Sequence, residues 1–517
     1  MCGVEDLPDS LLLSMFCWLD RKDLCAVSTC CRTWARVGWD ELLWKSLFLR
    51  HFDLPNSAAM PEDAVSWRLE FRRLYQDVPC IEAVKLTAHA DEVLHVTFSQ
   101  DGSLFASCSK DCSVKVWDGH SYELLHNEDL HNRSWLYSQF SQFSHDGLRL
   151  LVSGVKNSPF EMSSGSILIF SLDGFSLLTA ADIKPYDVFG CWFGGEAFLS
   201  GNIEAFSIFR FSVNFALEKF FHMQRQLLHF RLVNYSYPRM LTIARAHTGE
   251  EDIMLEADND YDDDDGNKLL IFATGSLTCA SHQIGIKLLP AEVLRTLIKL
   301  PRVAEGLVEH DADGHEDEEE ANIEAVDDWL DARGFQGNID GPTSLDWLLE
   351  FNGQIVGLCL SPDHRYLFVN CRSWAPDTKI NDPMCPPPIS NIITLHEVDL
   401  WSLERGKHVR ISEKTEFRRF LGHKAFTPED RCFFMFMDAS RSLLSSGSED
   451  GSAYVWDRHY GACIARLLHH DVVNSVALHP TRHGVLVTAS DDHTLRVWHP
   501  RSLQHHDGLE SVETTTG

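Results

Sequence analysis

The chain has 517 residues, of which 44% are hydrophobic, and it carries a formal net charge of −31. This length exceeds one ordinary domain, and the apolar fraction is sufficient for a large buried core. Because binding to phosphate backbones requires compensating Lys and Arg side chains, the acidic balance argues against a nucleic-acid partner.

The negative charge is concentrated in two segments. Residues 250–265 hold ten acidic side chains and residues 305–331 hold thirteen, so the rest of the chain carries a net charge of only −8. Acidic runs of this kind are often solvated and disordered.

No targeting, membrane or metal-binding pattern is present. The first ten residues, MCGVEDLPDS, lack the basic and apolar regions of a signal peptide, and no run reaches the roughly eighteen apolar residues of a membrane span. The fifteen cysteines include no CxxC pair, so we expect no metal site and no cofactor. Reduced thiols in the cytoplasm are expected, with the nucleus as the alternative compartment.

The first fifty residues predict three short helices. Leu12, Met15, Phe16 and Leu19 recur at i, i+3, i+4 and i+7 and form an apolar helix face, and Asp20 and Asp40 are suited to cap the next two helices. Three helices over about 45 residues bury too little apolar surface to be stable alone. The segment is therefore expected to dock on a partner.

This stretch resembles an F-box. The family motif is matched by Leu7-Pro8, a Leu-rich helix from Leu11 to Leu19, Asp23-Leu24, Cys31, Trp34 and Leu43-Trp44. The resemblance implies that residues 4–50 bind the Skp adaptor of a cullin-RING ubiquitin ligase. The adaptor-binding residues that we select are Leu7, Pro8, Leu11, Phe16, Leu24, Trp34 and Trp44. In the alternative interpretation, these apolar residues form only the helical core.

Residues 51–80 are predicted to be a helical linker. Residues 61–78 begin with Pro61 and space Trp67, Phe71 and Leu74 helically. A rigid helix here would fix the distance between the first module and the next domain.

Three later segments repeat one pattern, at residues 88–118, 422–457 and 469–499. Period-2 alternation and turn signals predict short β-strands, and the segments resemble WD repeats, which form four-stranded propeller blades. The resemblance implies a structural network of His, Ser or Thr, Asp and Trp in each blade. By position these are His89, Ser107, Asp111 and Trp117, then His423, Ser446, Asp450 and Trp456, then His469, Thr488, Asp492 and Trp498. Their recurrence at corresponding positions favours a structural role over a catalytic Ser-His-Asp triad.

Degenerate blades are predicted between these repeats. One spans residues 137–180 and another 186–222, a fourth blade is assembled from 239–244, 252–257, 268–275 and 282–289, and a fifth begins near residue 354. The strand at 81–87 can complete the last blade and close the ring. The predicted fold is thus α plus all-β: a three-helix F-box and a linker helix, a seven-bladed WD-repeat β-propeller over 81–500, and a disordered tail at 501–517.

Five insertions are expected to lie on one face of the propeller, at 155–165, 258–267, 290–350, 373–391 and 424–432. Elaboration of one face suggests that this face binds a partner. Lys110, Glu449, Asn474 and Asp491 are the residues that we expect on this substrate face. In the alternative interpretation, the acidic segments 258–267 and 305–331, the latter within the insertion 290–350, are only solvated and disordered.

An F-box followed by seven blades resembles the F-box/WD-repeat family. The resemblance implies a non-catalytic, substrate-recognition subunit of an SCF-type ubiquitin ligase, which binds the Skp adaptor, a cullin-RING core and protein substrates. One alternative is a cullin-4-type ligase, bound through its damage-binding adaptor at Trp117-Asp118-Gly119-His120 or Trp456-Asp457-Arg458-His459, where His replaces the expected Arg. A second alternative is a non-degradative scaffold.

Overall fold

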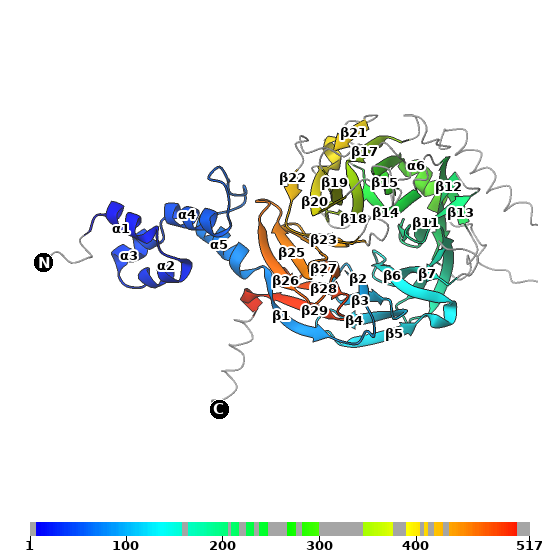
Figure 1. The fold of residues 1–517 in the computed structure, drawn as a ribbon, viewed down its shortest axis with the longest axis horizontal. Helices are drawn as coiled ribbons and strands as arrows, with labels where there is room; N and C mark the ends of the chain where they lie inside the picture. The colour runs from blue at the N-terminus through cyan, green and yellow to red at the C-terminus, as the bar shows by residue number, and fades with distance from the viewer. Residues whose placement is uncertain are drawn as a thin grey trace, which may run out of the picture.

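The computed structural model describes residues 7–157, 164–204, 208–216, 224–231, 237–246, 266–275, 282–298, 345–375, 389–403, 408–411, 418–427 and 434–503. Figure 1 shows two parts, a group of helices at the N-terminal end and a ring of β-sheets beside it.

The N-terminal part contains α1 (Asp9–Phe16), α2 (Arg21–Val27), α3 (Arg32–Gly38), α4 (Glu41–His51) and α5 (Trp67–Gln76). Both predicted caps form: Asp20 accepts a hydrogen bond from the N–H of Asp23, and Asp40 accepts one from the N–H of Leu42, each at 2.8 Å. The three predicted helices of the first module are present, but α3 is a fourth, so the predicted count is one too few. Its N-terminus is capped by the thiol of Cys31, a weak acceptor that sequence rules do not recognise as a cap.

The linker helix α5 begins at Trp67, six residues later than predicted. Ser66 has extended backbone angles, and its hydroxyl accepts a hydrogen bond from the N–H of Leu69 at 3.2 Å. This serine cap fixes the helix start. The proline at position 61 therefore lies before the helix and not in its first turn.

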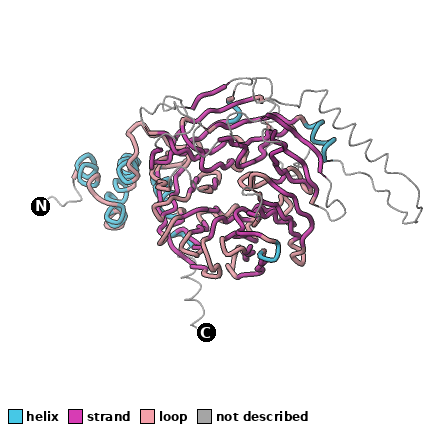
Figure 2. The backbone as a smooth tube through the Cα atoms, turned by 45° about the vertical axis from the view of Figure 1, so that its right-hand side comes forward, coloured by secondary structure: helices cyan, strands magenta, loops and turns pink. Residues whose placement is uncertain are grey.

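Seven sheets follow one another around the ring, as Figures 1 and 2 show, and the predicted seven-bladed propeller is confirmed. Blades one to three are β2 (Val93–Phe98), β3 (Leu104–Ser109), β4 (Ser113–Asp118) and β5 (Leu124–Asp129); β6 (Trp135–Phe143), β7 (Arg149–Lys156), β8 (Gly165–Ser171) and β9 (Leu177–Ile183); and β10 (Cys191–Trp192), β11 (Ala197–Glu204), β12 (Ile208–Phe215) and β13 (Gln224–Arg231).

The remaining blades complete the circle. Blades four and five are β14 (Tyr237–Arg245), β15 (Lys268–Gly275), β16 (Gln283–Leu289), β17 (Trp347–Phe351) and the added β21 (His408–Ile411); and β18 (Gly353–Leu360), β19 (Tyr366–Trp374), β20 (Ile389–Asp399) and β22 (Arg418–Phe420). Blades six and seven are β23 (Met437–Ala439), β24 (Leu443–Ser446), β25 (Ser452–Asp457) and β26 (Cys463–Leu468); and β27 (Val473–Leu478), β28 (Leu486–Ser490), β29 (Leu495–Pro500) and β1 (Pro79–Leu86).

The ring closes as predicted, because β1 pairs antiparallel with β29 and places Lys85 opposite Arg496. The outer strand of the last blade thus comes from the segment that directly follows the linker helix. This pairing removes the open edge and ties the helical part to the ring by a short connection.

Blade four differs from its predicted composition. Residues 252–257, predicted to be one of its strands, lie outside the described residues, and β14 to β17 complete the blade without them. The range 290–350, predicted to be an insertion, contains both the outer strand β17 and a helix, α6 (Ala291–Ile298). Val293, Leu294 and Leu297 of α6 are buried in the core, which is the reason that this segment is ordered.

The strand order of blade four also changes the face on which its insertions lie. We define the upper face of the ring as the face that carries the connections between the second and third strands of each blade and the connections between blades. The lower face carries the connections from first to second strand and from third to fourth strand. Because antiparallel strands alternate in direction, the connections alternate between these faces. The strand ends that flank 258–267 and 290–350 lie on the lower face, since they join first to second and third to fourth strands. The prediction of one shared face is wrong for these two insertions, whose acidic runs themselves lie outside the described residues.

Candidate adaptor-binding and substrate-binding surfaces

Three of the seven predicted adaptor-binding residues lie inside the helical core. Phe16, Leu24 and Trp44 are buried, and the Trp44 indole N–H donates to the backbone oxygen of Gly38 at 3.0 Å. Side chains with so little exposed surface contribute mainly to the helical core. The alternative interpretation as core therefore holds for these three residues, and burial does not support their assignment to the adaptor surface.

The other four predicted residues are more accessible. Pro8 and Leu11 are exposed, whereas Leu7 and Trp34 are half-buried. The Trp34 ring packs edge-on against Phe16, with ring centroids 5.7 Å apart. Pro8 and Leu11 are thus the members of the predicted set that a partner can reach directly.

An apolar surface extends along α1 and includes two residues that were not selected from the sequence. Leu11 is 51% exposed, Met15 is 53% exposed and Trp18, just after the helix, is 82% exposed. We call these three residues the α1 face. They recur at i, i+4 and i+7 and therefore share one side of the helix, although helical spacing also groups Met15 with the buried Leu12 and Phe16. Exposed apolar side chains gathered in this way are typical of protein-binding surfaces.

The linker helix α5 fastens the helical part to the lower face of blade six. An Nη atom of Arg73 lies 2.9 Å from the carboxylate of Asp457, whose side chain is only 1% exposed, and another lies 2.9 Å from Glu70. The Tyr460 hydroxyl donates to Glu70 at 3.2 Å, and its ring packs 5.0 Å from that of Phe48. Burial alone would lower the pKa of Arg73, but its two carboxylate neighbours raise it above its ordinary value. We call Glu70, Arg73, Asp457 and Tyr460 the α5 clamp.

The α5 clamp covers one of the two candidate boxes for a cullin-4-type ligase. Trp456 and Asp457 are buried, and His459 Nε2 lies 2.9 Å from the carbonyl oxygen of Ala59 in the linker. In the other box, Asp118 accepts hydrogen bonds from two N–H groups of its own turn, at 2.9 and 2.7 Å. The box at Trp456–His459 is thus covered by the chain's own linker.

The first predicted tetrad forms a continuous hydrogen-bonded chain in blade one. His89 Nδ1 lies 2.8 Å from Asp111, and Nε2 lies 2.8 Å from the hydroxyl of Ser107. The Trp117 indole N–H donates to the same hydroxyl at 3.0 Å. This arrangement satisfies buried polar groups and leaves no free nucleophile.

Blade seven repeats the arrangement. His469 lies 3.0 Å from Asp492 and 2.6 Å from Thr488, and Trp498 donates to the Thr488 hydroxyl at 2.9 Å.

The tetrad predicted in blade six does not form. His423 Nε2 lies 2.9 Å from the side-chain oxygen of Asn370, and the Trp456 indole donates to the backbone oxygen of Leu421 at 3.0 Å. The carboxylate of Asp450 instead accepts a hydrogen bond from the hydroxyl of Tyr454 at 2.7 Å. Tyr454 stands where the other two blades have Lys115 and Arg496, and its phenol captures the aspartate.

Blades one and two provide a matched test of the tetrad. Ser107→Ala is expected to lower the free energy of unfolding by about 2 kcal/mol or more, because buried His89 and Trp117 nitrogens each lose a partner. Ser153 is likewise a buried serine in the second strand of its blade, blade two, but its hydroxyl has no partner among the described residues. Ser153→Ala is therefore expected to cost less than about 0.5 kcal/mol in urea unfolding. Equal losses for the two variants would contradict the network.

Two buried histidines make the fold sensitive to acid. Burial lowers the pKa of both His95 and His423 to about 3, from an ordinary 6.5. The unfolded chain therefore binds protons first, and stability is lost as the pH falls from 6.5 toward 3, by about 1.4 kcal/mol per pH unit for each residue. In a variant with both residues replaced by Gln, we expect the free energy of unfolding in urea to fall less between pH 6.5 and pH 5 than it does in the unchanged chain.

The exposed His131 provides the control for that measurement. His131→Gln should retain the pH dependence of the unchanged chain. A double variant with the same slope as this control would exclude His95 and His423 as the source.

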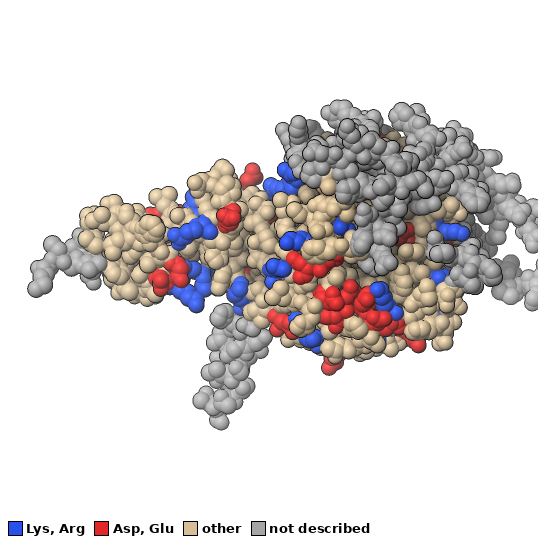
Figure 3. Space-filling model, in the orientation of Figure 1, with Lys and Arg blue, Asp and Glu red and all other residues tan. Residues whose placement is uncertain are grey.

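Three of the four predicted substrate-face residues lie together on the upper face, between blades seven and one. Asn474 donates to Asp491 at 2.6 Å, and Lys110 forms an ion pair with Glu92. Burial, opposed by the bond from Asn474, raises the pKa of Asp491 to about 6. Figure 3 shows acidic side chains gathered over this region, around β2, β3, β27 and β28.

Glu449 lies on the same face, in the connection between β24 and β25 of blade six. Its carboxylate accepts hydrogen bonds from the backbone N–H groups of Phe426 and Thr427, the latter at 2.6 Å, and so holds the connection that enters blade six.

Comparison with known proteins gives the same two modules. The F-box-like family model matches residues 4–50, and the WD domain, G-beta repeat model matches 81–118, 418–457 and 461–499. The chain is 35% identical to F-box/WD repeat-containing protein 5 of Mus musculus, over 96% of this chain and 94% of that protein. The chain belongs to the F-box/WD-repeat family.

The human F-box/WD repeat-containing protein 5 is similarly related, at 35% identity over 97% of this chain and 96% of its own length. A WD repeat-containing protein 26 homolog of Arabidopsis thaliana is 29% identical over only 31% of this chain and 22% of its own. The similarity to the F-box/WD-repeat relatives therefore covers helices, linker and propeller together. Within the described residues, no helix is long and apolar enough to cross a bilayer.

Proposed function

We propose that this F-box/WD-repeat chain is the substrate-recognition subunit of an SCF-type ubiquitin ligase. The observation that carries the proposal is an exposed apolar face on α1, held by the α5 clamp at a fixed position relative to the propeller. The α1 face binds the Skp adaptor and, through it, the cullin-RING core. The propeller binds the protein to be ubiquitinated.

The mechanism is one of proximity. Holding the substrate near the ubiquitin-charged enzyme raises the effective concentration of its lysines, and no residue of this chain makes or breaks a bond. The linker joins the lower face of the propeller, so we assign substrate binding to the upper face. We place this activity in the cytoplasm, with the nucleus as the alternative.

The cullin-4-type alternative receives less support. Its blade-six box is covered by Arg73 and by Ala59 of the chain's own linker, so docking there requires the linker to be displaced.

The full-length chain, isolated from cells, tests the proposal. We expect the Skp adaptor and a cullin-1-type subunit to co-purify, and bound proteins to acquire ubiquitin when a charged conjugating enzyme is added. Recovery of a cullin-4-type subunit without the Skp adaptor would contradict the proposal. An assembled complex that never ubiquitinates a bound protein would favour the scaffold alternative.

A further inference from the structure

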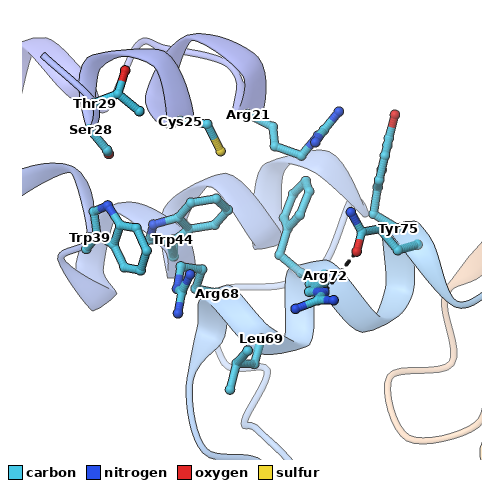
Figure 4. Close-up of a pocket in the computed structure, with 12 residues that line it drawn as sticks. Arg21, Cys25, Ser28, Thr29, Trp39, Trp44, Arg68, Leu69, Arg72 and Tyr75 are labelled. Carbon is cyan, nitrogen blue, oxygen red and sulfur yellow. Dashed lines mark hydrogen bonds between the residues drawn. The ribbon is translucent and has the colours of Figure 1, made fainter. Parts of the chain in front are cut away.

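A groove between α2 and α5 holds three arginine side chains that have no carboxylate partner among the described residues. Its volume is about 310 Å³, and α2 forms one wall while α5 forms the other, as Figure 4 shows. Arg21 extends from α2, and Arg68 and Arg72 extend from α5. A chain with a net charge of −31 thus presents a cationic groove.

Each guanidinium is held in place by a neighbouring side chain. Arg21 lies 4.2 Å from the ring centroid of Tyr75, and Arg68 lies 4.0 Å from that of Trp39. Arg72 donates a hydrogen bond to the side-chain oxygen of Gln76 at 2.9 Å. A guanidinium stacked on an aromatic face keeps its edge N–H groups available for a carboxylate. The three cations are therefore ordered before any ligand arrives.

The base of the groove is apolar. Trp44 and Phe71 are buried beneath it, while Trp39 and Leu69 at its rim remain 52% and 41% exposed. A cavity of this size is at the small end of the range for ligand sites and accommodates one or two apolar side chains. The groove thus combines charge recognition at the rim with apolar burial below.

The groove is not a part of the F-box module alone. The F-box-like model ends at residue 50, whereas Arg68, Leu69 and Arg72 lie on the linker helix α5. The α1 face is formed by residues of a different helix. The groove is therefore a feature of the joint between F-box and propeller in this chain.

We propose that the groove binds a short acidic peptide segment with an apolar side chain, belonging to a protein other than the adaptor. Its carboxylates pair with Arg21, Arg68 and Arg72, and its apolar side chain enters the cavity above Phe71. A protein bound there lies against both the F-box and the linker, so it reaches the ligase without occupying the upper face of the propeller. The ligase role in this statement rests on the proposed function, but the binding site does not.

Fluorescence polarisation with a labelled peptide, Glu-Glu-Leu-Glu-Glu-Leu-Glu-Glu, tests the proposal on the full-length chain. We expect this peptide to bind at least about tenfold more tightly than the same peptide with Gln in place of Glu, since charge-assisted pairs are lost. Arg68→Gln with Arg72→Gln should weaken binding by at least about tenfold. Lys22→Gln with Arg32→Gln removes two exposed charges elsewhere on the F-box and should leave binding within about twofold.

The adaptor separates this proposal from the proposed function. The Arg68→Gln, Arg72→Gln variant should still capture the Skp adaptor, and the adaptor-bound chain should still bind the acidic peptide. Equal affinity for the two peptides, equal loss in the control variant, or exclusion of the peptide by the adaptor would overturn the proposal. Failure of the full-length chain to capture any adaptor, with peptide binding intact, would overturn the ligase role and leave the groove.

Discussion

A chain with Leu11→Asp and Trp18→Asp is expected to lose the Skp adaptor. Both side chains are exposed on the α1 face, so burial against a partner is their principal contribution to binding. Large apolar anchors at interfaces contribute about 2 kcal/mol or more each, which predicts a weakening of at least about a hundredfold. The adaptor recovered with the purified chain, measured by titration, checks this result.

A second variant controls for added charge and for folding. Ser10→Asp with Ser57→Asp adds two carboxylates to exposed positions outside the α1 face and should keep the adaptor. Both double variants should unfold within about 0.5 kcal/mol of the unchanged chain, because surface substitutions rarely cost more. Retention of the adaptor by the Leu11, Trp18 variant, or equal loss in the serine variant, would exclude the α1 face as the docking surface.

Arg73→Ala is expected to be among the most destabilising single substitutions at the joint. It leaves the carboxylate of Asp457 buried without a compensating cation, a change that costs about 3–5 kcal/mol. Adding Asp457→Ala should recover part of this loss, because only the carboxylate of Glu70 then remains without its cation. Urea unfolding of the two single variants and the double variant measures the coupling.

The same variants connect the joint to function. If the α5 clamp sets the geometry of the ligase, Arg73→Ala should slow ubiquitin transfer to a bound substrate while adaptor capture persists. Glu62→Ala changes an exposed residue of the linker outside both the groove and the α5 clamp, and it should leave both stability and transfer nearly unchanged. A transfer rate that is unaffected by Arg73→Ala would show that a rigid joint is not required.

The two faces of the propeller have different tasks in this arrangement. The α5 clamp engages the lower face at blade six, whereas the cluster of Asn474, Asp491 and Lys110 lies on the upper face. A substrate bound at the upper face is therefore separated from the F-box by the thickness of the ring. The acidic insertions begin and end on the lower face, which is also the face that the linker contacts. They do not begin or end on the upper face, where substrate is expected.

Local patterns in the sequence are enough to predict the two modules and the strand that closes the ring. Helical spacing and aspartate caps predict three of the four F-box helices, and period-2 alternation with WD signatures predicts the blades. The regular blades are readable because each strand's partner lies only a few residues away. The outer strand β17 of blade four was not predicted, because the segment 299–344 separates it from β16 in the sequence.

Sequence alone could not decide which side chains face outward or which meet across the chain. Leu12 and Leu11 are both apolar residues of one helix, yet only the packing of the N-terminal helices together buries the first and leaves the second exposed. Arg73 and Asp457 show no local signal of their ion pair, because they meet only when the linker docks on blade six.

The sequence by itself determined the F-box, the repeat and the closing strand, since each depends on periodicity within a short segment. Tertiary structure decided the face of each insertion, the failure of the tetrad in blade six and the cationic groove beside α5. Those features depend on the position of each strand within its blade and on contacts between residues that are distant in the sequence. Neither can be read from a local sequence pattern.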